Sequence, residues 1–421
     1  MKKYNLIVVG GGLTGVAASV CAAREGLSVL LVEQSGNLGG AMSTNLVYPF
    51  MRFWTEPAGQ ERKNLSAGIF SEMLRRAAEY VSQSGVRDFA PEAFKFLLDD
   101  MVEEAGVDVL FHAMLHTVKT EGRKVTSVDF ATKAGPMEFE ADFFIDATGD
   151  GDLMAFAGCQ FQLGREADGL CQPMTTCFRV AGVDNALLDK DERIRIKEVY
   201  KQDKAAGKIQ NPREDVLLFQ GPALGNGIVH FNTTRIVKLD PTDPIAVSRA
   251  EMTARKQIRE LMAFLKEHDF PAFRNAYLVN IASAIGVRES RKLKGEHILT
   301  ADELIGCTMF DDAVALGNYD IDIHNPEGSG TSHRYFAPGE YYSIPYRSVL
   351  PKEFDNLLVG GRCLSATHEA QASVRIMPFC ATMGQAVGTA IAVAHKSGAN
   401  THTVDIKAVQ KILRDNGAAI D

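Results

Sequence analysis

Short apolar runs alternate with a helical stretch of small residues over the first 33 residues of the chain. Residues 6–9 and 29–32 are apolar throughout, which is typical of strands buried on both faces of a parallel sheet. The glycines Gly10, Gly12 and Gly15 stand between the first run and the helical stretch. This order of strand, glycine turn, helix and second strand predicts a βαβ unit that binds a dinucleotide.

The residues of this unit have separate predicted roles. Gly10 permits a tight turn, Gly12 lets the backbone approach the phosphates, and Gly15 lets the helix pack against the strand. The pyrophosphate then meets the positive N-terminal end of the helix. Glu33 ends the second strand, where a carboxylate can bind a ribose 2′-hydroxyl and repels a 2′-phosphate. An ordinary glycine-rich turn is the alternative, but the strands, helix and acid around it favour the dinucleotide site.

Farther along the chain, hydrophobic spacing predicts helices over residues 69–84, 91–105, 189–205 and 243–267. The apolar positions of the first helix are Ile69, Phe70, Met73, Leu74, Ala77 and Val81. Apolar runs predict strands over residues 107–111, 115–120, 125–131, 137–141, 175–180 and 228–232. No regular pattern can be assigned around Tyr48, Phe50, Phe53 and Trp54.

Two later apolar runs repeat the pattern of the first strand. Residues 143–146 end at Asp146 and precede small residues, which leave room for a ligand at the carboxyl edge of a parallel sheet. Those small residues are Ala147, Thr148 and Gly149. Residues 356–359 form the second run, and small residues over 383–394 predict a helix that lies close to a sheet or a ligand.

These patterns predict an α/β protein whose two chain ends form one domain. We expect a Rossmann-like domain, with a parallel sheet, helices and a β-meander, from residues 1–159 and 351–421. Residues 160–350 are richer in Arg, His, Asp and Tyr and include a loop-like stretch over 318–340. We predict that they form an inserted α+β domain that shapes a substrate pocket.

Composition and charge narrow the class of protein. Of the 421 residues, 46% are hydrophobic and 23% are charged, as in ordinary globular proteins. The formal net charge of −8 and the lack of a basic cluster in the sequence disfavour a nucleic-acid partner. No apolar run in the sequence reaches the roughly twenty residues that cross a bilayer, so we expect no membrane span.

The seven cysteines are scattered and include no C-x-x-C pair. This pattern suits buried thiols in a reducing cytoplasm better than a disulfide framework or a zinc site. Lys2 and Lys3 before an apolar stretch resemble a secretory signal, but the glycines interrupt it and no cleavage site follows. We therefore expect a first strand at this position and a cytoplasmic location.

Two segments, besides the glycine unit, point to a known family. The first is Asp-Ala-Thr-Gly-Asp-Gly-Asp at residues 146–152, and the second is Gly-Arg-Cys-Leu-Ser-Ala-Thr-His-Glu-Ala-Gln at residues 361–371. With residues 172–175 and 286–291, they make the chain resemble FAD-dependent oxidoreductases of the glutathione-reductase-like superfamily, over nearly its whole length. The resemblance implies a Rossmann-like FAD-binding domain and FAD as the cofactor, and it leaves the substrate open.

The resemblance also implies a set of cofactor-binding residues. The pyrophosphate is expected at Gly10, Gly12, Leu13, Thr14 and Gly15, and the adenosine ribose at Glu33 and Gln34. The route to the flavin is expected along Gly39, Gly40, Ala41 and Met42, with adenine at the backbone of Val118. Ala147, Thr148 and Gly149 are expected beside the dinucleotide, with Gly361 and Arg362 at the ribityl chain. Backbone amides at a helix start, where they stabilise reduced flavin, are expected from Met383, Gly384 and Gln385.

Two histidines are candidates for the chemistry at the flavin. His368 lies between the Gly-Arg segment and Arg375, so we expect it to face the isoalloxazine ring; a hydrogen-bonded structural histidine is the alternative. His230 and Asn232 share one face of a predicted strand, because positions two apart point the same way. We expect this face to meet the substrate, and a satisfied polar pair at a domain boundary is the alternative.

Arginines and a polar stretch supply further candidates. On a helix, Arg288 and Arg291 would share a face and could clamp a carboxylate; internal ion pairs with Glu289 or Glu296 are equally compatible with the spacing. Asp320, Asp322 and His324 would lie on one side of an extended segment beside Tyr319, but flavin chemistry needs no metal and we expect none. Thiols near a flavin can be redox partners, yet burial as small hydrophobic residues is the expectation for Cys171, Cys177 and Cys380.

The predicted function is an FAD-dependent dehydrogenase or reductase that moves a hydride between a small polar metabolite and flavin N5. Noncovalent FAD is the simpler expectation. An electron-transfer component is the first alternative; without an iron–sulfur cysteine cluster it would need an external partner protein. A flavin-dependent RNA-modifying protein is the second, and the acidic charge argues against it. The oligomeric state and any redox partner stay open.

Overall fold

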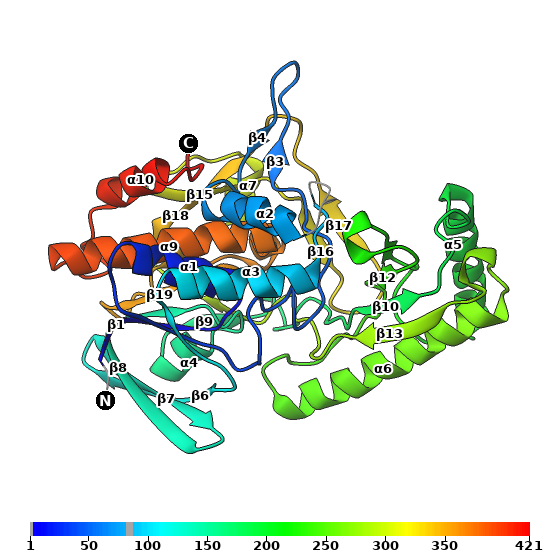
Figure 1. Ribbon diagram of the computed structural model, residues 1–421, viewed down its shortest axis with the longest axis horizontal. Coiled ribbons are helices and arrows are strands. Elements are labelled where there is room, and N and C mark those ends of the chain that lie inside the picture. Colours follow the sequence, from blue (N-terminus) through cyan, green and yellow to red (C-terminus); the bar gives the residue numbers. More distant parts are fainter. Residues whose placement is uncertain (1–2, 81–86) are drawn as a thin grey trace.

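The computed structural model describes residues 3–80 and 87–421. Figure 1 shows two parts: a layered α/β body that contains both ends of the chain, and a lobe at the right formed by the middle of the chain. The predicted α/β class is therefore confirmed.

A parallel sheet runs through the body. Its strands lie in the order β5 (Asp108–Leu110), β2 (Val29–Val32), β1 (Tyr4–Val9), β8 (Gly135–Asp146) and β19 (Leu357–Val359). The last strand comes from the C-terminal part of the chain and pairs with the end of β8. Both ends of the chain are thus needed to complete the sheet.

Both faces of this sheet are covered, which explains why its strands are apolar throughout. One face packs against the helices α1 (Leu13–Arg24), α3 (Pro91–Glu104) and α9 (Met377–Ser397). The other packs against β6 (Met114–Glu121), β7 (Lys124–Thr132) and α4 (Asp152–Ala157). Along β1, Leu6 and Val8 belong to the first layer, and Ile7 and Val9 belong to the second.

β8 is one continuous strand of 12 residues, not the two strands predicted over 137–141 and 143–146. Its first half pairs antiparallel with β7, where Ser127 lies opposite Glu140. Its second half lies parallel between β1 and β19. The carboxylate of Asp142 pairs with Lys3 at 2.8 Å, so this polar residue interrupts the apolar pattern without ending the strand.

The amphipathic helices match the sequence prediction. Besides α3, the structure contains α5 (Lys190–Ala205) and α6 (Pro244–Glu267), and the Asp189 and Asp243 side chains cap their first turns. In the described residues α2 spans Ile69–Tyr80. The rest of the helix predicted to residue 84, with Val81, lies outside the described residues.

The helix predicted from Met383 begins earlier, at Met377. Pro378 in its first turn is the signal that the prediction missed, since proline favours the first positions of a helix. A Cβ added to Gly384 would lie 2.2 Å from the backbone oxygen of Thr14. The small residues of α9 therefore serve its close contact with α1.

In the part of the chain that the structure describes, α9 is also the single helix long and apolar enough to cross a membrane, with a mean hydropathy of 1.3 over its most apolar window. The expectation that no apolar run reaches this length was wrong. Of that window, 89% is buried inside the protein, as in a core helix.

The lobe has its own sheet and hydrophobic core. Its strands lie in the order β11 (Leu218–Phe219), β12 (Val229–Phe231), β10 (Phe178–Ala181) and β13 (Tyr277–Ile281). One face packs with α5 and α6 around Phe178, Phe231 and Ile258. The opposite face carries His230, whose ring lies 5.4 Å from the ring of Tyr48 in the body. This polar face therefore turns toward the body.

Residues 299–350 pack mainly in the hydrophobic cluster of the body, although the prediction assigned them to the inserted domain. They contain the antiparallel pair β15 (Ala313–Gly317) and β18 (Tyr342–Pro345). The stretch predicted as loop over 318–340 holds a hairpin of β16 (Ile321–His324) and β17 (Thr331–Arg334). The polar residues that alternate with isoleucine in β16 hid this strand. The domain boundaries themselves stay a prediction.

The aromatic segment without a predicted pattern is buried in the body. Phe50 stacks on Phe89, with ring centroids 4.2 Å apart, and Tyr48 and Phe53 join the same cluster. The remaining elements are β3 (Trp54–Thr55), β4 (Lys63–Asn64), β9 (Phe161–Leu163), β14 (Arg291–Leu293), α7 (Ala301–Ile305), α8 (His368–Val374) and α10 (Ile406–Asp415).

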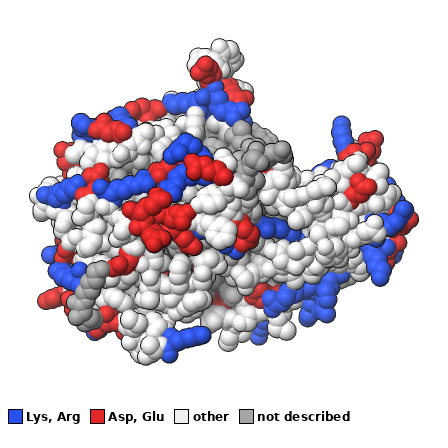
Figure 2. Space-filling view, in the orientation of Figure 1, with Lys and Arg blue, Asp and Glu red and all other residues white. Residues whose placement is uncertain are grey.

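Charges of both signs are interleaved on the face seen in Figure 2. Acidic side chains gather over α3, and the neighbouring helices carry basic ones. Arg24 pairs with Glu72 at 2.7 Å, and Arg76 pairs with Glu104 at 2.7 Å. This face presents no basic stripe of the kind that binds nucleic acid.

Candidate functional site

The turn between β1 and α1 requires glycine at two positions. Gly10 has φ +104°, and a Cβ there would lie 2.4 Å from the backbone oxygen of Ala147. A Cβ on Gly15 would lie 1.8 Å from the backbone oxygen of Gly10. Both obstacles are backbone atoms, which cannot rotate away as a side chain can. The turn therefore depends on these two glycines.

The N-terminal end of α1 is left open for an anion. Gly12 caps the helix, no side chain accepts a bond from its first turn, and that turn holds no acid. A Cβ on Gly12 would meet only the Cα of Gly40, at 4.0 Å, so a ligand can reach this backbone. Leu13 and Thr14 begin the helix, and Gly39 bridges to Gly12. Free N–H groups and an approachable backbone fit a pyrophosphate.

Glu33 is buried directly after β2. Its carboxylate accepts hydrogen bonds from the backbone N–H of Gly11 at 2.6 Å and of Ser35 at 2.7 Å. Ala113 donates its N–H to the backbone oxygen of Glu33, whereas Val118 lies farther along β6, opposite Val128. Two backbone donors thus hold the acid beside the glycine turn.

The other predicted residues of this region lie around the turn. Gln34 is exposed, and Ala41 follows the Gly39–Gly40 pair, which crosses the start of α1. Met42 is fully buried, and a Cβ added to Gly39 would lie 2.6 Å from its methyl group.

The turn after β8 is ordered by a buried acid. Asp146 accepts bonds from the N–H of Thr148 at 3.0 Å, its hydroxyl at 2.7 Å and the N–H of Met154 at 2.8 Å. Burial raises the pKa of Asp146 to about 6, against these bonds. Gly149, with φ +79°, leaves room for the guanidinium of Arg362, which would lie 3.0 Å from a Cβ there.

Segments far apart in sequence meet at this edge of the sheet. Arg362 donates to Asp150 at 2.5 Å, and the hydroxyl of Thr14 donates to the backbone oxygen of Cys380 at 3.0 Å. A Cβ on Gly361 would lie 2.7 Å from that hydroxyl. The three segments that the family resemblance assigns to the cofactor are therefore neighbours, and together they form a cradle that fits an elongated dinucleotide.

Three residues predicted to offer open backbone amides to the flavin do not lie at the start of a helix. Met383, Gly384 and Gln385 stand inside α9, so their amides belong to the helix and not to its open end. The side-chain oxygen of Gln385 accepts the N–H of Ile69 at 3.0 Å. The helix start is at Met377, whose N-cap makes no side-chain bond. The open amides that the prediction sought thus belong to the first turn, which begins at Met377.

His368 ends a buried chain of charged groups. Its Nδ1 lies 2.9 Å from Oε1 of Glu289, and Lys292 donates to the same oxygen at 2.5 Å. The N–H of Gln172 donates to the other oxygen at 3.0 Å. Burial opposes the charge on Glu289, but His368 and Lys292 hold its pKa below the usual range. Glu289 as the partner of His368, and Lys292 as the second partner of Glu289, were not predicted, because only the fold brings residues 289 and 368 together.

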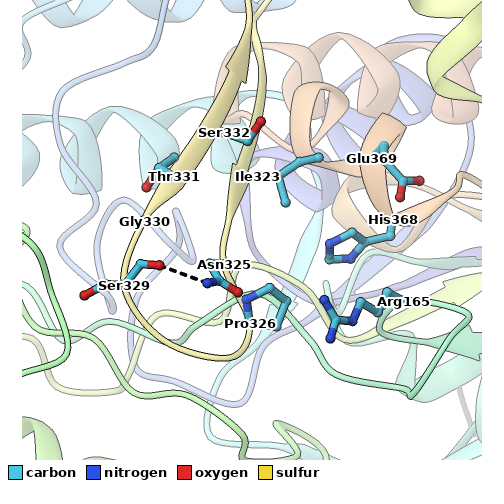
Figure 3. Close-up of a pocket in the computed structure, with 10 residues that line it drawn as sticks. All are labelled: Arg165, Ile323, Asn325, Pro326, Ser329, Gly330, Thr331, Ser332, His368 and Glu369. Carbon is cyan, nitrogen blue, oxygen red and sulfur yellow. Dashed lines mark hydrogen bonds between the residues drawn. The ribbon is translucent and has the colours of Figure 1, made fainter.

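A cavity of about 410 Å³ opens beside His368 (Figure 3). It lies between the β16–β17 hairpin and the first turn of α8. Its lining residues are Arg165, Ile323, Asn325, Pro326, Ser329, Gly330, Thr331, Ser332, His368 and Glu369. Since Glu289 holds Nδ1 of His368, Nε2 is the ring atom left to exchange a proton.

Arg288 and Arg291 do not share a helix face, because this segment is not helical: Arg288 lies at a bend and Arg291 begins a strand. Arg291 begins β14 and pairs with Asp152 at 2.8 Å, whereas Arg288 reaches into the lobe. The predicted clamp of these two arginines is therefore wrong. The alternative pairing with Glu289 is also absent from the described residues, since Glu289 binds Lys292 and His368.

His230 is fully buried on the polar face of the lobe, opposite Arg179 in the neighbouring strand. Both ring nitrogens of His230, and Nε and one terminal nitrogen of Arg179, are buried without a hydrogen-bond partner in the described residues. Burial and the charge of Arg179 lower the pKa of His230 to about 3. A neutral imidazole with two unpaired nitrogens is suited to a bound polar group.

This depressed pKa predicts how stability changes with pH. Unfolded His230 takes up a proton below about pH 6.5, but the folded protein keeps it neutral down to about pH 3, so stability falls as pH falls through this window. Replacing His230 with Phe should remove about 1.4 kcal/mol of the loss measured between about pH 7.5 and 5.5. Urea unfolding of the parent and the variant at these two pH values measures the loss of stability.

The matched control is His116→Gln, at an exposed position on β6. It should leave the pH dependence as in the parent protein. An unchanged pH dependence in His230→Phe would contradict burial as the cause.

The polar stretch of the hairpin is a hydrogen-bonded cluster. The hydroxyl of Tyr319 donates to Asp322 at 2.9 Å, and His324 lies 3.4 Å from the same carboxylate. Asp322 and His324 therefore share a side of β16, as predicted. No group of side chains suited to a metal ion occurs within the described residues. All seven cysteines are free thiols, including the buried Cys171 and Cys177 and the partly buried Cys380.

Comparison with known proteins agrees with this geometry. Residues 5–413 match the model of a family described as FAD dependent oxidoreductase. A match over 104 residues is 33% identical to the NADH:fumarate oxidoreductase of Klebsiella pneumoniae (strain 342). It covers 23% of this chain and 11% of that protein.

Solved structures that resemble this chain do so at low sequence identity. A geranylgeranyl bacteriochlorophyll reductase-like protein from Thermoplasma acidophilum is 13% identical, with a TM-score of 0.51 over 99% of this chain and 85% of its own. An L-proline dehydrogenase from P. horikoshii is 12% identical, with a TM-score of 0.48 over 98% and 99%. At this identity the likeness to the first structure supports the fold alone.

Proposed function

Because the chain belongs to the family of FAD-dependent oxidoreductases, we propose that it oxidises or reduces a small polar metabolite at the junction of the body and the lobe. FAD, held by the cradle around Gly10, Gly12, Glu33, Thr148 and Arg362, supplies N5 as the atom that accepts or gives the hydride. The protein supplies a place for the metabolite and groups that orient it.

One contact carries this proposal. The side-chain amide of Gln371, on α8, donates to the backbone oxygens of Arg288 at 3.0 Å and of Arg362 at 3.3 Å. Arg362 belongs to the cofactor cradle, while the side chain of Arg288 donates to Thr175 and Asn232 beside the lobe sheet. Gln371 therefore ties the polar face of the lobe to the cradle, where substrate and cofactor must meet.

Several side chains at this junction can act on a substrate. Arg288 is placed to orient it, and His230 and Arg179 offer unpaired polar atoms on the same face. His368 is the candidate for proton transfer, because Glu289 fixes its ring and leaves Nε2 toward a partner.

Anaerobic titration of the purified protein tests this function. The protein should be yellow, denaturation should release FAD, and at least one small polar metabolite in a panel should bleach the flavin absorbance. A colourless protein that FAD cannot reconstitute would exclude the proposal. Bleaching by NADH or a redox protein, with no response to any metabolite, would favour an electron-transfer component instead.

A further inference from the structure

Arg288 is a partly buried cation whose hydrogen-bond partners are all neutral. Its guanidinium donates to the backbone oxygen of Pro173 at 2.7 Å, to the hydroxyl of Thr175 at 2.5 Å and to the side-chain oxygen of Asn232 at 3.3 Å. No carboxylate within the described ranges forms an ion pair with it. A guanidinium that is partly shielded from water and has no acid beside it is stabilised by a ligand that supplies the negative charge.

The charges around Arg288 increase this imbalance. Among the like charges around it, Arg375 lowers the pKa of Arg288 the most, and Nε of Arg375 is buried and unpaired in the described residues. The acid whose charge acts on both is Asp322, which already accepts the hydroxyl of Tyr319 at 2.9 Å and lies 3.9 Å from Arg375. Its single negative charge cannot neutralise both guanidinium groups.

Two further arginines nearby have acids of their own. Arg213 lies 3.6 Å from Asp215, and Arg235 lies 3.3 Å from Glu214. Burial and the neighbouring arginines lower the pKa of Arg288 to about 9, which still leaves it charged at neutral pH. After these pairings, about one positive charge at Arg288 and Arg375 has no partner.

We propose that Arg288 and Arg375 bind a carboxylate group of the substrate. The proposal rests on the proposed function, since it names the substrate class of the same junction. A carboxylate carries the single charge that is missing, whereas a phosphate ester brings between one and two, and a planar guanidinium fork matches a carboxylate. Asn232 and Thr175 hold Arg288 in orientation, so the fork is placed before the ligand arrives.

Binding to the holoprotein tests the substrate class without turnover. The probes are lactate, succinate and malate, the corresponding amides, and inorganic phosphate. The readouts are the perturbation of the visible flavin spectrum and the shift in melting temperature. At least one carboxylate should give both signals, and its amide should give neither.

Substitution of Arg288 connects this binding to the residue. Arg288→Gln, at equal FAD content, should weaken the binding of that carboxylate by roughly 10- to 100-fold, as for the loss of a charged hydrogen bond. Arg288→Lys keeps the charge without the planar guanidinium, so its affinity for the carboxylate should lie between those of the parent and of Arg288→Gln. Arg274→Gln, with the same charge change at an exposed site outside the junction, should bind like the parent.

The outcomes separate this inference from the proposed function. Equal binding of acids and amides, a response to phosphate alone, or unchanged binding in Arg288→Gln would overturn the carboxylate site. Bleaching by a neutral metabolite, without any carboxylate response, would overturn it and leave the proposed function standing. A carboxylate that binds through Arg288, in a protein that no metabolite reduces, would support the site and reject the proposed reaction.

Discussion

Replacing Gly10 with alanine is expected to give a destabilised protein that purifies without flavin. The added Cβ would lie 2.4 Å from the backbone oxygen of Ala147, at a φ of +104° that residues with side chains rarely adopt. The turn would have to move away from the end of β8, and the first turn of α1 with it. The ratio of flavin to protein absorbance and the melting temperature measure the two effects.

The Gly12→Ala variant separates cofactor binding from folding. Its Cβ has open space and its φ of −66° suits alanine, so the apoprotein should unfold like the parent apoprotein. The methyl group would still obstruct the approach of a phosphate, so FAD binding should weaken by at least about tenfold. Gly328→Ala, in an open loop, is the control and should keep its full flavin content. Full flavin occupancy in both Gly10→Ala and Gly12→Ala would refute the assignment of the cradle.

The second large effect is expected at Glu289. Glu289→Gln leaves the ammonium group of Lys292 buried without its acid, since Lys292 is 1% exposed and Glu289 is 0% exposed. Removing one partner of such a pair should lower the free energy of unfolding by about 3–5 kcal/mol. Denaturant unfolding of the holoprotein, or of both apoproteins, measures this loss.

A double variant tests the cause of this loss. Glu289→Gln with Lys292→Met removes both charges, so it should recover most of the stability that Glu289→Gln loses. The control is Asp415→Asn, which breaks the exposed pair with Lys411 and should change the free energy of unfolding little. A double variant no more stable than Glu289→Gln would show that the loss does not come from the stranded charge.

Local patterns predicted the parts of the fold that depend on local rules. The βαβ unit, α3, α5 and α6 follow from apolar spacing, capping acids and glycines, all of which lie close together in sequence. The sequence predicted two strands in place of β8 because Asp142, which pairs with Lys3 at the surface, interrupts the apolar pattern. The small residues from Met383 onward do not mark the start of α9, which lies at Met377, because they reflect contact with α1.

The candidate site could be predicted only in part. The glycines and Glu33 lie within one local unit, so their arrangement follows from spacing. By contrast, the partners of Arg288 lie far from it in sequence, at Thr175 and Asn232, and no spacing rule connects them. The same holds for Glu289, which precedes β14, and His368, which begins α8, because only the fold brings them into contact. The expectation of a helix around Arg288 was wrong, because this segment forms a bend whose arginine is held by contacts distant in sequence.

The pairing of β19 with β8 sets an order of events during synthesis. A ribosome that has released residues 1–350 has made the glycine turn, but neither the strand that completes the sheet nor the helix that packs on α1. The lobe, in contrast, draws its core from one continuous stretch between Phe178 and Phe273, so it can fold while the rest is still being translated. We therefore expect FAD to bind late, after β19 and α9 have been made, and chains that terminate earlier to lack a complete cofactor site.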